Sequence, residues 1–158
     1  MKIKGLIEYD ISNYYKPSMF IIFPNCSFKC DRECGRPICQ NSALAHEPEI
    51  EISVDKIVGK YINNPLTKGI VCGGLEPFDS FDDLYNLIRV FRLYTDDDIV
   101  IYTGYTEEEC GLAVGELALM ADNIIVKFGR FISDQESHYD EVLGINLASP
   151  NQYARRIS

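Results

Sequence analysis

Apolar residues occur along the chain in short continuous runs, and a polar or glycine-rich segment follows each run directly. A run of this length without polar interruption is typical of a strand that is buried on both faces of a parallel sheet. The polar pair or glycine after it marks the end of the predicted strand. The predicted strands cover residues 19–23, 70–72, 99–102 and 124–126, with a weaker one at 5–9.

Between these strands, apolar residues recur three and four positions apart, which indicates helices that each bury one face. Ser53 is the predicted cap of the first helix, and Asp79 or Ser80 that of the second. Thr106 and Glu109 have the spacing of a capping box at the start of the third. The residues expected to face the core are Val54, Ile57, Val58, Tyr61, Ile62, Phe81, Leu84, Leu87, Ile88, Phe91, Cys110, Val114 and Leu117, together with Cys72 in its strand.

One helix between successive strands is the βαβ pattern, which predicts a mostly parallel sheet with right-handed crossovers. Four or five strands are too few to close an eight-stranded barrel, which takes about 250 residues. We therefore expect an open or partial α/β barrel. The chain shows no repeat, linker or low-complexity tract, so residues 1–158 are expected to form a single domain.

The composition is that of a globular protein, with 46% hydrophobic residues and a net charge of −9. This acidity argues against a nucleic-acid or anionic-membrane partner, because both require a basic face. The apolar runs are too short to span a bilayer, and the N-terminus lacks a signal-peptide pattern, so we expect a cytoplasmic protein. Four basic residues near the C-terminus are interpreted as a solvated face, with contact to an acidic partner as the alternative: Lys127, Arg130, Arg155 and Arg156.

Four cysteines fall within fourteen residues, at positions 26, 30, 34 and 39, and Gln40 and Asn41 follow at once. This cluster loop, residues 25–41, comes directly after a predicted strand. The segments Gly73–Pro77 and Thr103–Tyr105 follow the next two strands. Because ligands bind at the carboxyl ends of parallel strands, all three segments are expected to line one site.

Cysteines this close together in a reducing compartment indicate metal binding before they indicate disulfides. Structural zinc usually takes two separated pairs of ligands, whereas the gaps here are three, three and four residues within one loop. The two histidines, His46 and His138, are remote in sequence. An iron–sulfur cluster fits better, since three cysteines can bind three irons of a [4Fe–4S] cluster and leave the fourth iron open.

Several motifs together resemble a known family. Cys39-Gln40-Asn41 is similar to the end of the three-cysteine loop of radical S-adenosylmethionine (SAM) proteins, and Gly73-Gly74-Leu75-Glu76-Pro77 to their Gly-Gly-Glu-Pro turn. Further similar segments are 102–105, 127–131 and 149–152. The chain most resembles the activating protein of the anaerobic ribonucleotide reductase, a glycyl radical enzyme activase, which implies a compact partial (β/α) barrel of the radical SAM type.

The chain departs from that family in two places. The family's cysteine spacing is three residues and then two, whereas here three residues are followed by either three, to Cys34, or eight, to Cys39. We predict Cys26, Cys30 and Cys39 as the ligands, because Cys39 carries the Gln-Asn ending, with Cys34 as the alternative third ligand. Leu75 is also inserted into the glycine–glutamate turn.

The resemblance implies that the cluster and SAM generate a 5′-deoxyadenosyl radical, which abstracts hydrogen from a glycine of a partner enzyme. That partner is expected to be the large subunit of the anaerobic ribonucleotide reductase, with a flavodoxin or ferredoxin as electron donor. No catalytic residue is expected beyond the cluster ligands. The implied SAM-binding residues are Gln40, Asn41, Gly73, Gly74, Glu76, Thr103 and Tyr105.

Three alternatives remain open at the level of sequence. The chain is a radical SAM enzyme for another protein, a peptide or a small molecule; a zinc-stabilised interaction module without activity; or a degenerate relative that binds a cluster but leaves SAM intact. Colour separates the second from the others, because zinc proteins are colourless and [4Fe–4S] proteins are brown.

Overall fold

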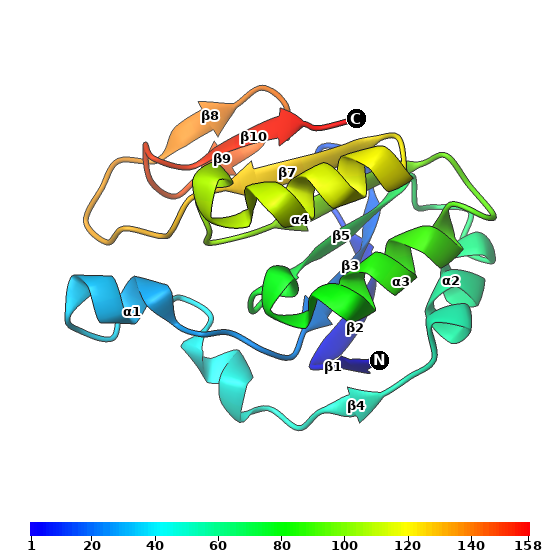
Figure 1. Ribbon diagram of the computed structural model, residues 1–158, viewed down its shortest axis with the longest axis horizontal. Helices are drawn as coiled ribbons and strands as arrows, with labels where there is room; N and C mark the ends of the chain where they lie inside the picture. The colour runs from blue at the N-terminus through cyan, green and yellow to red at the C-terminus, as the bar shows by residue number, and fades with distance from the viewer.

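The computed structural model describes all residues 1–158 and is built on one six-stranded sheet with the order β10-β7-β6-β5-β3-β2 (Figure 1). The four inner strands are parallel, and both edge strands run antiparallel to their neighbours. The inner strands are β3 (Ser18–Phe23), β5 (Gly69–Gly74), β6 (Asp98–Tyr102) and β7 (Ile124–Phe128), and the edges are β2 (Gly5–Asp10) and β10 (Tyr153–Arg156). The predicted mixed α/β architecture with a mostly parallel sheet is therefore present, whereas the radical SAM type of barrel stays a prediction.

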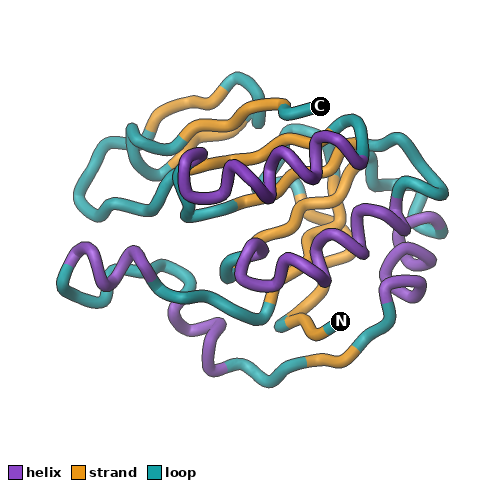
Figure 2. Tube along the Cα trace, viewed as in Figure 1, coloured by secondary structure: helices purple, strands orange, loops and turns teal.

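Three helices follow one another along one face of the sheet, α2 (Val54–Ile62), α3 (Phe81–Phe91) and α4 (Glu107–Met120) (Figures 1 and 2). Ser53 caps α2 by accepting a hydrogen bond from the backbone N–H of Lys56, and Thr106 and Glu109 form the predicted capping box. The prediction for Ile62 is wrong, since this last residue of α2 is 47% exposed. None of the helices is long and apolar enough to cross a bilayer.

The inner strands contribute side chains to two hydrophobic cores, because successive side chains of a strand point to opposite faces of the sheet. Ile70 and Cys72 pack toward the helices, while Val71 between them packs into a smaller core on the other face. Cys110 lies in the larger core, so both cysteines outside the loop are buried, as predicted. The strands are thus buried on both sides, which explains their lack of polar alternation.

The second face of the sheet is covered by a C-terminal hairpin that the sequence pattern did not indicate, formed by β8 (His138–Asp140) and β9 (Ile145–Leu147). The buried Asp140 carboxylate accepts hydrogen bonds from the backbone N–H groups of Leu143 and Ala154, at 2.9 and 2.8 Å. The hairpin is thereby tied to β10.

The remaining elements are short. β1 (Lys2–Ile3) pairs with β4 (Ile50–Glu51), and two 3₁₀ turns cover Ser42–His46 and Pro77–Ser80. Helix α1 (Lys29–Cys34) buries none of its residues, so packing against the core does not hold it in place. Its position depends on polar contacts made by the cysteine loop.

Candidate metal centre

The three ligand-rich segments meet at the carboxyl ends of β3, β5 and β6, where they surround a cavity of about 400 Å³. This juxtaposition follows from the parallel arrangement of the strands, as the sequence predicted. Three of the predicted site residues, Cys34, Gly73 and Tyr105, do not line the cavity. Those that do are Cys26, Cys30, Cys39, Gln40, Asn41, Gly74, Glu76 and Thr103.

The four loop cysteines divide into two kinds. Cys26, Cys30 and Cys39 are half-buried and face the cavity, whereas Cys34 is exposed and lies outside the cavity lining. No cysteine of the chain forms a disulfide. The structure thus brings together the three cysteines predicted as ligands and leaves the alternative ligand apart from them.

A single carboxylate makes the long spacing between Cys30 and Cys39 possible. Asp31 Oδ1 accepts hydrogen bonds from the backbone N–H groups of Ile38 and Cys39, each at 2.8 Å. These two bonds close the loop on the first turn of α1. The intervening residues, among them Cys34, are therefore pushed outward while Cys39 returns to the cavity.

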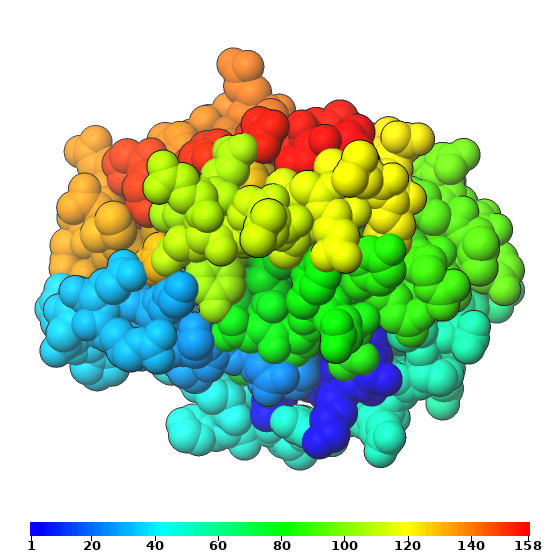
Figure 3. Space-filling model, viewed as in Figure 1, coloured from blue at the N-terminus to red at the C-terminus, as the bar shows by residue number.

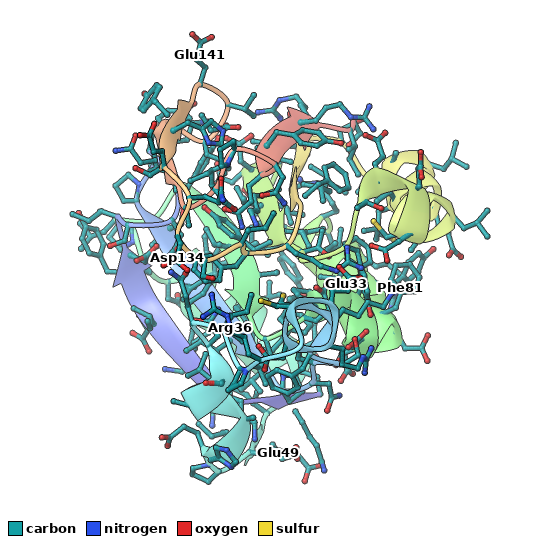
Figure 4. All side chains as sticks on the ribbon, turned by 90° about the vertical axis from the view of Figure 1, so that its left-hand side faces the viewer. Glu33, Arg36, Glu49, Phe81, Asp134 and Glu141 are labelled. Atoms are coloured by element: carbon teal, nitrogen blue, oxygen red, sulfur yellow. The ribbon has the colours of Figure 1, made fainter.

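Further contacts fix the cysteine loop to neighbouring segments. The Asn41 side-chain amide donates to the carbonyl of Gly74, at 2.7 Å, and so joins the loop to the glycine turn. The Arg36 guanidinium bonds the side chains of Ser133 and Asp134, at 2.9 and 3.1 Å. Figure 4 looks onto this end of the molecule and shows Arg36 beside Asp134. Figure 3 shows the cysteine loop in contact with the segment that follows β7.

The glycine turn requires glycine at its second position. Gly74 has φ +85°, and a Cβ there would lie 2.4 Å from Ile22 Cγ2. A side chain is therefore excluded both by the backbone conformation and by the close approach of β3. The inserted Leu75 is buried and lines the cavity, so the insertion is accommodated inside the site.

Glu76 forms hydrogen bonds that connect the glycine turn to the Thr103–Tyr105 turn. Its carboxylate accepts from the backbone N–H groups of Phe78, at 3.1 Å, and Gly104, at 2.8 Å, and its own N–H donates to the carbonyl of Asn25. Burial raises the pKa of this carboxyl to about 7, although the hydrogen bonds oppose the shift. Glu76 thus fixes the geometry of the glycine turn relative to the Thr103–Tyr105 turn.

In the Thr103–Tyr105 segment, only one of the two predicted residues lines the cavity. Thr103 lines the cavity, and its hydroxyl accepts from the backbone N–H of Tyr105, at 2.9 Å. The Tyr105 hydroxyl instead bonds Asp79, which also accepts from the backbone N–H of Ser27, at 2.6 Å. Asp79 is therefore a support of the cysteine loop, and neither Asp79 nor Ser80 makes the predicted side-chain cap of α3.

The interpretation of four C-terminal basic residues as a solvated face is wrong for two of them. Lys127 is 6% exposed, lines the cavity and donates to the carbonyl of Gly129, at 2.8 Å. Burial lowers the pKa of its ammonium to about 8. The sequence contains a signal for this burial, because Lys127 continues an apolar strand that is buried on both faces. The Arg130 side chain is 11% exposed, whereas Arg155 and Arg156 lie on the surface.

A comparison with protein families relates the chain to iron–sulfur proteins. A family model described as a 4Fe-4S single cluster domain matches residues 18–150, a span that contains every cysteine of the chain. The chain belongs to the 4Fe-4S single cluster domain family. No curated protein matches the chain.

The donor set of this 4Fe-4S domain fits such a cluster. Each thiolate of a [4Fe–4S] cluster binds a different iron, so the sulfurs surround a volume rather than one point. Cys26, Cys30 and Cys39 all line the cavity of about 400 Å³, so their sulfurs face a common volume. Cys26, Cys30 and Cys39 would therefore hold the cluster.

The surroundings of these thiols would also tune the cluster. Burial raises the pKa of Cys26 to about 11 and raises that of Cys30. The backbone N–H of Phe28, a residue with φ +51°, bonds the Cys26 sulfur at 3.2 Å. The Arg130 cation favours the Cys30 thiolate. Hydrogen bonds and positive charge near the sulfurs stabilise the charged ligands that iron requires.

Proposed function

We propose that this 4Fe-4S domain binds SAM beside its cluster and activates a glycyl radical enzyme, most specifically the anaerobic ribonucleotide reductase. One observation carries the proposal. The cysteine loop and the glycine turn, which resemble two separate signatures of radical SAM proteins, line the same cavity and are joined by the bond from Asn41 to Gly74.

Different residues of the cavity would bind different parts of the cluster and of SAM. Three thiolates leave one iron of the cluster without a protein ligand, where SAM would bind through its amino and carboxylate groups. The chain at Gly74 has no side chain to obstruct the approach of a ligand to its backbone. Gln40, Asn41 and Thr103 supply polar groups at the cavity wall, and Glu76 keeps the glycine turn in place.

The size and chemistry of the cavity support a small organic ligand. Its volume of about 400 Å³ lies within the range of small-molecule sites, roughly 300–1,000 Å³. When bound, the reduced cluster and SAM supply a 5′-deoxyadenosyl radical. The protein orients the ligand and limits access of water, so no general acid–base pair is required.

The partner is proposed from the resemblance of the chain to glycyl radical enzyme activases. A glycine loop of a partner protein is therefore the proposed substrate, with a flavodoxin or ferredoxin as the source of electrons.

The experiment is an anaerobic assay of SAM cleavage. The chain is reconstituted with iron and sulfide, reduced with dithionite and mixed with SAM, and 5′-deoxyadenosine is measured. The large subunit of the anaerobic ribonucleotide reductase is then added, and a glycyl radical is sought by electron paramagnetic resonance (EPR). A brown protein that leaves SAM intact both alone and with this subunit would refute the proposed activity.

A matched pair of variants tests the ligand set in the same assay. Cys34→Ala is expected to keep the cluster absorbance and the release of 5′-deoxyadenosine, because Cys34 lies outside the cavity. Cys39→Ala is expected to lose both. The reverse result would assign the third ligand to Cys34.

A further inference from the structure

Arg130 is an incompletely paired cation at the edge of the cluster site. It follows Gly129 at the end of β7, and its Nη2 forms ion pairs with Glu33 of α1, at 3.0 Å, and with Glu109 of α4. Its Nε is buried and has no hydrogen-bond partner. A buried donor without an acceptor is destabilising, so this atom points to a partner that arrives with the cluster.

The sulfur of Cys30 lies on the same side of the site and is a candidate acceptor. Arg130 and Cys30 flank the same glycine, since a Cβ on Gly104 would lie 3.9 Å from both Arg130 Cγ and Cys30 Sγ. The guanidinium of Arg130 is positively charged and a ligating Cys30 thiolate is negatively charged, so geometry and charge both relate Arg130 to this cysteine.

We propose that Arg130 donates a hydrogen bond from Nε to the Cys30 thiolate of the bound cluster and thereby raises the reduction potential of the cluster. A hydrogen bond to a ligating sulfur withdraws negative charge from the cluster. The reduced cluster carries one more negative charge than the oxidised cluster, so the donor and its positive charge stabilise the reduced form more.

The carboxylates of Glu33 and Glu109 both pair with Nη2, and Nε is the buried nitrogen of the guanidinium that they leave without an acceptor. In the planar guanidinium, the N–H of Nε points in a different direction from those of Nη2. Arg130 is therefore a positioning residue that acts on the cluster through Cys30, and it makes no proposed contact with SAM.

The test is a redox titration of the reconstituted domain without SAM, followed by EPR of the reduced cluster. Arg130→Gln is expected to shift the midpoint potential to a more negative value, and Arg130→Lys, which keeps the charge but lacks Nε, to shift it less. Arg155→Gln is the matched control, because Arg155 pairs with Glu107 on the surface of the same helix turn. Equal potentials in wild type, both Arg130 variants and the control would overturn the proposal.

A second measurement tests the proposed hydrogen bond directly if an Arg130 variant fails to hold the cluster. Wild-type protein labelled with ¹⁵N-arginine is reduced and studied by pulsed EPR, where a hydrogen bond to Cys30 gives a ¹⁵N coupling to the cluster. Absence of this coupling in wild type would overturn the proposal. Because neither measurement uses SAM, failure of the proposed activity leaves this test unaffected.

Discussion

Replacing Asp31 by alanine is expected to weaken retention of the cluster while leaving the fold intact. The change removes two hydrogen bonds from a carboxylate to the backbone, at 2.8 Å each, and these bonds hold Cys39 at the cavity. A hydrogen bond to a charged group contributes about 1.5–3 kcal/mol, and partial exposure of Asp31 to solvent reduces this to roughly 1 kcal/mol each. The combined loss of about 2 kcal/mol corresponds to roughly 30-fold weaker retention.

Retention is measured as the rate at which an iron chelator removes the cluster under anaerobic conditions, followed by absorbance. Asp134→Ala is the matched control, since this variant breaks the exposed ion pair with Arg36 on the outer side of the same loop. It is expected to lose the cluster no more than about 5-fold faster than wild type, because exposed pairs contribute less than about 1 kcal/mol. Equal loss rates for Asp31→Ala and wild type would refute the assignment of Asp31 as the residue that closes the loop.

The stability of the apo protein separates a loop effect from a general one. Helix α1 buries no residue, so the unfolding temperature of Asp31→Ala is expected to stay close to that of wild type. A large fall in that temperature would show that the loop is coupled to the main core, against the reasoning above.

Three further changes are expected to alter stability, each measured by thermal or urea unfolding of the apo protein. Gly74→Ala is expected to lose about 3 kcal/mol, or roughly 6–12 °C, because φ is +85° and the new methyl would meet Ile22. The folded pKa of Glu76 lies near 7, above its unfolded value, so wild-type stability falls as pH rises from about 4.5 to 7; Glu76→Gln should flatten this slope. The folded pKa of Lys127 lies near 8, below its unfolded value, so wild-type stability rises between about pH 8 and 10.5, and Lys127→Met should remove that rise. An unchanged unfolding temperature, or an unchanged pH slope, contradicts the corresponding prediction.

The central sheet and its helices were predictable because their signals are local. Continuous apolar runs such as Ile99–Tyr102 and the capping box at Thr106 are set by residues close in sequence, and their period gives the element directly. The edge strand β2 was predicted from its weaker apolar run, but the C-terminal strands β8, β9 and β10 were not predicted. The hairpin of β8 and β9 depends on the buried carboxylate of Asp140, whose partners lie up to fourteen positions away.

The candidate site was predictable in its location but not in its full composition. Parallel strands bring their carboxyl ends to one edge, so the cysteine loop and the glycine turn had to meet. The roles of Lys127 and Arg130 depend instead on burial and on which carboxylates face them, and neither follows from sequence spacing. A charged residue within an apolar strand run is the one local signal that identifies Lys127.

The cysteine spacing illustrates how an altered motif can keep its geometry. In the sequence, Cys34 is closer to Cys30 than Cys39 is. Cys34 lies about one helical turn after Cys30 on α1. In space, Cys39 is the residue that reaches the cavity, because Asp31 accepts hydrogen bonds from the backbone N–H groups of Ile38 and Cys39 and the extra residues bulge outward. The spacing of a ligand motif is therefore determined by what closes the loop, and a carboxylate in the first turn of α1 extends the spacings that this fold accepts.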